Sequence, residues 1–320
     1  MKAAVYYQTG DPSVLKYEDV PDPVCGPREI MIDVKVVSLE GGDVLSRGAG
    51  VLVSTPHCGG YQASGVIIEV GEKVKDRKIG QRVATVNQHG SHAEKRAVPA
   101  NTSWVIPDNL SFEKAAPVPI MCGTAHDCVF EFGHLKKGET VLIHAGAGGV
   151  GTTAIQLAKR TGATVFATAS SNDRLEKLKE LGLDEGINYK DKDFVTEVKR
   201  LTNNKGVDLI IDPVSGEVLQ KSFEALAYRG RIVTMGFAGR DFKKYNIMPL
   251  MQKNQSITGY YQGAEMSSQR MHDLINRLLK EAASGELKIL IDRKYPLAEA
   301  AAAHAYVESR QAIGRVLLIP

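Results

Sequence analysis

The spacing of apolar residues changes partway along this chain of 320 residues. Up to about Ile120, apolar and polar residues alternate in short segments that Gly, Pro and Asp turns separate, and this pattern is typical of β-strands. Helical periodicity is nearly absent there, so we expect an all-β, barrel-like first domain. The clearest strands are expected at Ala3–Tyr7, Glu29–Val37, Ala63–Val70 and Arg82–Val86.

A different pattern starts at Ser111, a suitable N-cap residue, and predicts helical structure that ends before Gly138. Apolar strand-like segments then alternate with amphipathic helical ones, which requires parallel strands joined by right-handed crossovers. The sequence therefore predicts a doubly wound parallel sheet. Its strands are expected at 141–145, 164–168, 207–212, 231–235 and 256–259, with a further short segment at 186–189, and its helices at 150–161, 173–181, 194–201 and 217–226.

The last part of the chain does not continue this alternation. It predicts a long amphipathic helix at Met271–Ser284, a strand at Lys288–Tyr295, an alanine-rich helix at Leu297–Ser309 and a final strand at Gly314–Ile319. Because this is not another strand–helix unit, we expect it to return to the first domain. The chain is also long for one hydrophobic core. We therefore expect a domain of residues 1–121 completed by 262–320, and a second domain of residues 122–261.

A glycine-rich turn lies between the first predicted strand and helix of the sheet. Gly146, Gly148 and Gly151 have the G-x-G-x-x-G spacing of a dinucleotide-binding turn, and the strand before and the helix after lie where that function needs them. Together with Gly149 and Val150, they would bring backbone N–H groups at a helix N-terminus to a pyrophosphate. The alternative is an ordinary strand-to-helix connection that needs glycine to turn.

Composition limits the possible partners. Hydrophobic residues make up 43% and charged residues 24% of the chain, as in an ordinary globular protein. The net charge of +3 and the lack of a Lys/Arg block give no reason to expect nucleic acid or an anionic membrane as partner. No signal peptide or spanning segment is indicated, so we expect a cytoplasmic protein, and its four scattered cysteines should be reduced thiols.

Ordered motifs over nearly the whole chain resemble one family. The sequence resembles the zinc-free quinone oxidoreductase branch of the medium-chain dehydrogenase/reductase superfamily. The matching segments are GYQASGVIIEVGEKV (60–74), IGQRVATV (79–86), GSHAEKRAVPA (90–100), HAGAGGVGTTAIQLAK (144–159), INY (187–189), VDLIIDPVSGE (207–217), GRIVTMG (230–236) and the closing YPLAEAAAAHAYVESRQAIGRVLLIP.

The resemblance implies a GroES-like β-barrel catalytic domain and a Rossmann cofactor domain, assembled as a homodimer. It also implies that Thr124 and the run Gly236, Phe237 and Ala238 lie near the nicotinamide. No metal is expected, because Gly60-Tyr61-Gln62 replaces the Gly-His-Glu of the zinc enzymes and no other set of ligands is evident. The neighbouring His57 and Cys58 lack a third ligand.

Three residues favour NADPH over NADH. Ser170 stands where an NAD-type fingerprint places an acidic residue, and Arg174 follows one helical turn later. A guanidinium there could pair with a 2′-phosphate. Tyr189 matches a position that the family uses beside the same phosphate. The alternatives are N-capping for Ser170 and a solvated helix charge for Arg174.

The chemistry implied is hydride transfer to a small-molecule quinone or α,β-unsaturated carbonyl. Glu40 and His126 are candidate proton donors, while Leu45 and Tyr261 are candidates for the substrate pocket. For Glu40 the alternative is an exposed loop acid or a pair with a base such as Arg47, and for His126 a core or surface role. Two other functions stay open: an enone, enal or acryloyl-type double-bond reductase, and a crystallin-like NADPH-binding protein with little turnover.

Overall fold

The computed structural model describes residues 1–242 and 244–320. Its contacts divide the chain into two units: residues 1–123 together with 263–320, and residues 124–262. The C-terminal segment therefore packs with the N-terminal part.

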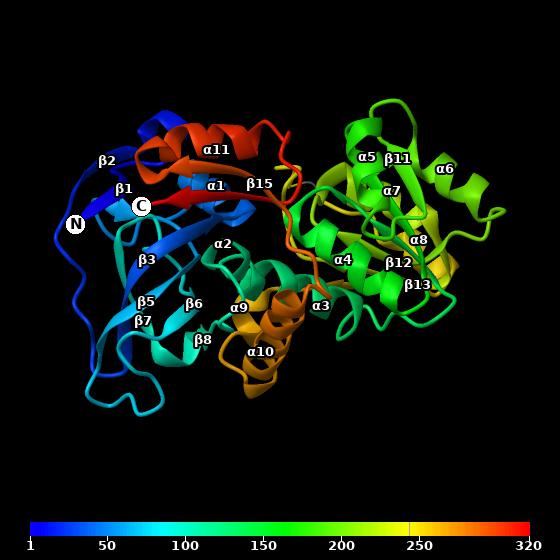
Figure 1. The fold of residues 1–320 in the computed structure, drawn as a ribbon. Coiled ribbons are helices and arrows are strands. Elements are labelled where there is room, and N and C mark those ends of the chain that lie inside the picture. The colour runs from blue at the N-terminus through cyan, green and yellow to red at the C-terminus, as the bar shows by residue number, and fades with distance from the viewer. Residues whose placement is uncertain (243) are drawn as a thin grey trace. The chain divides into compact units, whose positions relative to one another are not determined.

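The first unit is built mainly from strands (Figure 1). Its large sheet has the order β15-β16-β3-β5-β6-β8, with β7 also paired to β3. The final strand, β16, pairs antiparallel with β3 through Val316 and Leu39, so the C-terminus is part of the sheet. The elements are β1 (Lys2–Tyr6), β2 (Lys16–Asp19), β3 (Glu29–Leu39), α1 (Gly41–Ala49), β4 (His57–Cys58), β5 (Gln62–Val70), β6 (Arg82–Val86), β7 (Lys95–Pro99), β8 (Ser103–Val105), α2 (Phe112–Ala115), α10 (Gln269–Ser284), β15 (Ile291–Pro296), α11 (Ala300–Glu308) and β16 (Arg315–Ile319).

One apolar core joins both ends of the chain in this unit. Ile30 and Val37 of β3 pack in the same buried cluster as Ala303 of α11 and Leu318 of β16. Burying the side chain of Ile30, Val37 or Leu318 contributes about 1.5–3 kcal/mol each. The strands of the N-terminal part and the C-terminal segment therefore bury their apolar side chains in the same core.

The second unit is a parallel six-stranded sheet of order β11-β10-β9-β12-β13-β14. Every pairing in it is parallel, with helices connecting successive strands, which is the predicted Rossmann arrangement. The elements are α3 (Gly123–Val129), β9 (Thr140–Ile143), α4 (Gly149–Arg160), β10 (Thr164–Ala169), α5 (Asn172–Lys179), β11 (Glu185–Asn188), α6 (Phe194–Leu201), β12 (Val207–Asp212), α7 (Gly216–Ala225), β13 (Leu226–Thr234), α8 (Met248–Gln252), β14 (Ser256–Gly259) and α9 (Gln262–Glu265), which crosses into the first unit.

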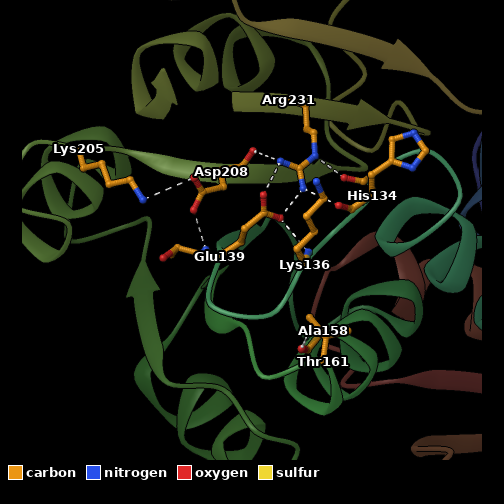
Figure 2. A network of polar contacts seen from close by, with 10 residues as sticks. His134, Lys136, Glu139, Ala158, Thr161, Lys205, Asp208 and Arg231 are labelled. Carbon is orange, nitrogen blue, oxygen red and sulfur yellow. Dashed lines mark hydrogen bonds and ion pairs between the residues drawn. The ribbon is translucent and has the colours of Figure 1, made fainter. Parts of the chain in front are cut away.

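A polar network fastens the amino ends of the central strands (Figure 2). The guanidinium of Arg231 on β13 donates to both carboxylate oxygens of Glu139 at 2.5 and 3.1 Å and to the carbonyl of His134 at 2.9 Å. Asp208 on β12 accepts from the backbone N–H of Thr140 on β9 at 2.9 Å. These bonds occupy the edge of the sheet opposite the glycine turn.

Two local predictions were wrong. The segment after β3 forms α1, although no helix was expected there; the Asp43 carboxylate accepts from the N–H of the N-cap residue Glu40 and closes the first turn. The helix predicted to run to about residue 137 ends at Val129. The chain doubles back there so closely that a Cβ at Gly133 would lie 2.1 Å from the carbonyl oxygen of Cys128.

Candidate cofactor and proton-transfer site

The glycine turn joins β9 to α4 at the carboxyl edge of the parallel sheet. A Cβ on Gly146 would lie 2.7 Å from the Cβ of Ala167, and one on Gly151 would lie 2.6 Å from the carbonyl oxygens of Ala145 and Gly146. Both glycines are therefore required by packing inside the protein. Ala145 adopts a φ of 50°, which makes the turn tight.

Gly148 differs from the other two glycines. A Cβ there would meet a single neighbour, the carbonyl oxygen of Ala145 at 3.3 Å. Gly148 is the N-cap of α4, so the first turn of the helix at Gly149, Val150 and Gly151 begins without a side chain to accept its N–H groups. Such a helix start, with space above it, suits a phosphate. The residues present fit a dinucleotide.

The three residues predicted to bind the 2′-phosphate come together at the ends of β10 and β11. Ala169 and Asn188 are paired in register, so Ser170 and Tyr189 follow at the same edge of the sheet. The Tyr189 N–H donates to the carbonyl of Ala169 at 3.1 Å, and Arg174 Nη1 donates to Ser170 Oγ at 2.9 Å. The Tyr189 side chain is 44% exposed. This corner of the sheet therefore holds the bonded side chains of Ser170 and Arg174 and, through its backbone contact, the exposed Tyr189.

The loop after β13 is held against the loop after β12. Gly236 accepts a hydrogen bond from Ser215 Oγ at 2.6 Å, and the Ala238 N–H donates to the carbonyl of Pro213 at 3.0 Å. Phe237 is exposed, and its ring packs against that of Phe242 at 5.4 Å. The buried Asp212, which the sequence analysis missed, accepts from the N–H groups of Val214 and Ser215 and fixes this loop. Burial raises the pKa of Asp212.

The segments around Thr124 and β14 share a set of polar contacts. Thr124 Oγ1 donates to Gln262 Oε1 at 2.6 Å, and Tyr260 OH donates to Asp127 Oδ2 at 3.0 Å. His126 Nδ1 lies 3.3 Å from Asp127 Oδ1. Tyr261, the predicted pocket residue, is exposed. The sequence analysis did not assign Asp127, Tyr260 or Gln262, although a His-Asp pair among mostly apolar helix residues was a visible signal.

Glu40 lies in a buried polar cluster of the first unit. Its Oε2 is 2.5 Å from a guanidinium nitrogen of Arg315 on β16, and its Oε1 accepts from Ser38 and Gln62. Burial raises the pKa of Glu40, and the charge of Arg315 opposes that rise. Arg47, named as a partner of Glu40 on sequence grounds, pairs instead with Glu308.

The neighbouring Asp43 is also buried and accepts from the N–H groups of Glu40 at 2.7 Å and Tyr61 at 3.1 Å. Burial raises the pKa of Asp43 to about 8. Leu45, on α1, is half-buried. Within residues 1–242 and 244–320, no group of three or more His, Cys, Asp or Glu side chains is placed to hold a metal ion.

Two family models match the chain: residues 26–108 match an alcohol dehydrogenase GroES-like domain, and residues 149–280 match a family described as zinc-binding dehydrogenase. A 2-haloacrylate reductase from Burkholderia sp. is 31% identical over 329 residues, covering 99% of this chain and 98% of the relative. Quinone oxidoreductase from Escherichia coli, solved with NADPH, superposes with a TM-score of 0.95 at 28% identity, with all of both chains covered. The chain belongs to the quinone oxidoreductase branch of the medium-chain dehydrogenase/reductase superfamily.

Membership of this superfamily confirms the predicted fold class, a Rossmann doubly wound sheet with a GroES-like domain. The chain is accordingly an oxidoreductase with an NAD(P)-type cofactor. The chain is also similar to a human protein, the synaptic vesicle membrane protein VAT-1 homolog, at 33% identity over 318 residues, or 93% of this chain and 80% of the relative. None of the helices that the structure describes is long and apolar enough to cross a membrane.

Proposed function

We propose that this medium-chain reductase uses NADPH to reduce quinones or α,β-unsaturated carbonyl compounds. The main support for NADPH over NADH is the corner formed by Ser170, Arg174 and Tyr189 beside the glycine turn. A guanidinium pairs with a phosphate through charge-assisted hydrogen bonds, whereas an acidic residue at the end of β10 would repel it. The quinone oxidoreductase from Escherichia coli was solved with NADPH, which supports the same choice.

The residues of the glycine turn have separable tasks in this proposal. The N–H groups of Gly149, Val150 and Gly151 bind the pyrophosphate, and Gly148 leaves room for it. Thr124 and the run of Gly236, Phe237 and Ala238 would line the nicotinamide. NADPH, when bound, supplies the hydride that the acceptor receives.

The two candidate proton donors are not equivalent in the structure. Both carboxylate oxygens of Glu40 are engaged, one by Arg315 and one by Ser38 and Gln62. His126 has a ring that is partly exposed and a carboxylate at one nitrogen. We therefore assign the proton supply to His126 and a structural role to Glu40. Leu45 and Tyr261 stay candidates for the acceptor pocket.

An acceptor screen tests the function. The purified protein is mixed with NADPH and a panel of quinones, enones, enals and acrylates, and loss of NADPH is followed at 340 nm. Turnover of quinones supports the first candidate. Turnover of acrylates or enals alone supports a double-bond reductase, the second candidate, which the similarity to a 2-haloacrylate reductase favours. Tight NADPH binding with no turnover would overturn the proposed reaction and leave a crystallin-like binding protein.

We also propose a homodimer in the cytoplasm. The dimer proposal is supported by β14, an edge strand of the Rossmann sheet, and by the exposed side chains of Ile247, Met248, Met251 and Ile257 near it. An exposed edge strand with apolar neighbours favours pairing with a second copy. Light scattering tests this: a monomer at micromolar concentration would contradict it, and Ile257→Lys should weaken a dimer.

A further inference from the structure

Tyr260 lies at the cofactor edge of the Rossmann sheet. It directly follows β14, and its N–H donates to the carbonyl of Thr234, the last residue of β13, at 2.8 Å. Gly236 begins the predicted nicotinamide loop two residues later. Because all strands of this sheet are parallel, their carboxyl ends share one edge with the glycine turn after β9. Tyr260 is thus placed where the chemistry is expected.

Two contacts connect Tyr260 to the imidazole ring of His126 through Asp127. Tyr260 OH donates to Asp127 Oδ2 at 3.0 Å, and the other carboxylate oxygen of Asp127 lies 3.3 Å from His126 Nδ1. The Asp127 side chain is completely buried, whereas that of His126 is 17% exposed. The ring of Phe130 packs against that of His126 with centroids 4.8 Å apart. Since Nδ1 faces Asp127, Nε2 lies on the opposite side of the ring.

Burying the side chain of Asp127 lowers the stability of the fold, so its presence calls for a functional explanation. Position 127 lies on the short helix α3 between buried residues, Cys128 and Val129 among them, where an apolar side chain would pack without loss. Burying a carboxylate costs several kcal/mol unless hydrogen bonds and an opposite charge compensate it. A tyrosine hydroxyl and an imidazole supply that compensation here. A carboxylate at Nδ1 also fixes the orientation of the ring.

We propose that Asp127 is a positioning residue, held in place by Tyr260, that orients His126 as the proton donor to the acceptor. The inference rests on the proposed reductase function and extends it. When the acceptor receives hydride at carbon, its π electron pair moves to the carbonyl oxygen. The Nε2–H bond of His126 then breaks, its electron pair stays on Nε2, and an O–H bond forms on the acceptor. The proton on Nδ1, which faces Asp127, stays on the ring, and Nε2 regains a proton from water.

Nuclear magnetic resonance of the cofactor-free protein, labelled with ¹⁵N-histidine, tests the positioning independently of turnover. The His126 resonances, assigned by their loss in His126→Gln, should report a proton on Nδ1, the nitrogen that faces Asp127. In Asp127→Asn this proton should be less firmly held on Nδ1. A wild-type His126 whose Nδ1 carries no proton would overturn the inference, because Asp127 would then not be its acceptor.

Kinetics with an acceptor from the screen supply the second readout. His126→Gln and Asp127→Asn should each lower kcat by about 100-fold or more, with the KM for NADPH changed less than about threefold. Tyr260→Phe keeps the carboxylate and is the variant to use should Asp127→Asn fail to fold; its kcat should fall about fivefold. The control is His134→Gln, an exposed histidine at the opposite edge of the sheet (Figure 2).

These outcomes separate the two proposals. A wild-type protein that reduces no acceptor contradicts the proposed function. A wild-type protein that reduces acceptors while His126→Gln and Asp127→Asn keep full kcat contradicts the inference alone. A fall in kcat accompanied by an equal rise in the KM for NADPH would also contradict it, because that result indicates a damaged cofactor site.

Discussion

A guanidinium nitrogen of Arg315 lies 2.5 Å from a carboxylate oxygen of Glu40, and both side chains are buried. Glu40 immediately follows β3, while Arg315 begins the C-terminal strand β16 that pairs with it. The ion pair therefore joins the N-terminal and C-terminal parts of the first unit. Ser38 and Gln62 bind the same carboxylate.

Replacing only Arg315 should lower the free energy of unfolding more than replacing both Arg315 and Glu40. Arg315→Met leaves a buried carboxylate without its cation, and we expect the free energy of unfolding to fall by about 3–5 kcal/mol. Adding Glu40→Gln should restore at least half of that loss, because the remaining group is neutral. Urea unfolding of the single and double variants measures both effects.

The matched control is the exposed pair of Lys294 and Glu113, with nitrogen and oxygen 3.0 Å apart. Lys294→Met should cost about 0–1 kcal/mol, since water solvates the remaining carboxylate. An Arg315→Met variant as stable as Lys294→Met would show that the buried pair contributes no more than a surface one.

The sequence predicted those parts of the site that depend on short spacing. The glycine turn, and Ser170 with Arg174 four residues later, follow from one strand and the helix after it, so local pattern was sufficient. Tyr189 was placed by a family motif, and the parallel register of Ala169 with Asn188 brings it beside Ser170.

Contacts between residues far apart in the sequence could not be predicted from the local pattern. Arg315 and Glu40 meet because β16 pairs with β3, and Tyr260 reaches Asp127 because the segment after β14 lies against α3. From sequence alone the nearest base to Glu40 was Arg47, whose actual partner is Glu308. The predicted helix was also too long at its C-terminal end. The apolar spacing continues past Val129, although the chain reverses direction at Gly133.

Reversing the charge at Arg174 should change the cofactor preference. Arg174→Glu replaces the guanidinium beside Ser170 with a carboxylate that repels a 2′-phosphate. The KM for NADPH should rise at least about 30-fold, while that for NADH should change less than about threefold, because NADH carries a hydroxyl there. Steady-state kinetics with both cofactors measure the split.

Arg200→Glu is the control for this charge change, since Arg200 lies exposed on α6 of the same unit. It should leave the ratio of the two KM values unchanged. Equal effects of Arg174→Glu and Arg200→Glu would assign the loss to net charge and not to a phosphate contact.

Two glycines of the turn should respond differently to alanine. Gly148→Ala meets one carbonyl oxygen at 3.3 Å, so the free energy of unfolding should change by less than about 1 kcal/mol. Its methyl group fills the space left for the pyrophosphate, and the Kd for NADPH should rise about tenfold or more. Calorimetric titration measures that affinity.

Gly151→Ala should instead weaken the fold itself. Its Cβ would lie 2.6 Å from two carbonyl oxygens, an overlap that costs about 1–3 kcal/mol. If Gly148→Ala bound NADPH as tightly as the wild type, the turn would not approach the pyrophosphate at that position.

Buried histidines should make the protein sensitive to mild acid. His144 is buried between Thr168 and Ser222, with ring nitrogens 3.2 and 3.0 Å from their hydroxyl oxygens. Burial lowers the pKa of His144 from 6.5 to about 3. The unfolded chain therefore binds a proton first, so stability is complete above about pH 6.5 and is lost as pH falls from there toward 3.

The variant His144→Leu isolates this contribution. The hydroxyls of Thr168 and Ser222 keep other partners, the N–H of Ala145 and the carbonyl of Val218. Between pH 7 and pH 5 the wild type should lose about 2 kcal/mol more unfolding free energy than His144→Leu. Replacing the exposed His134 with Gln should leave the wild-type pH dependence unchanged. Identical pH dependence in the wild type and His144→Leu would mean that His144 accepts a proton equally well in both states, contrary to its burial between two hydroxyls.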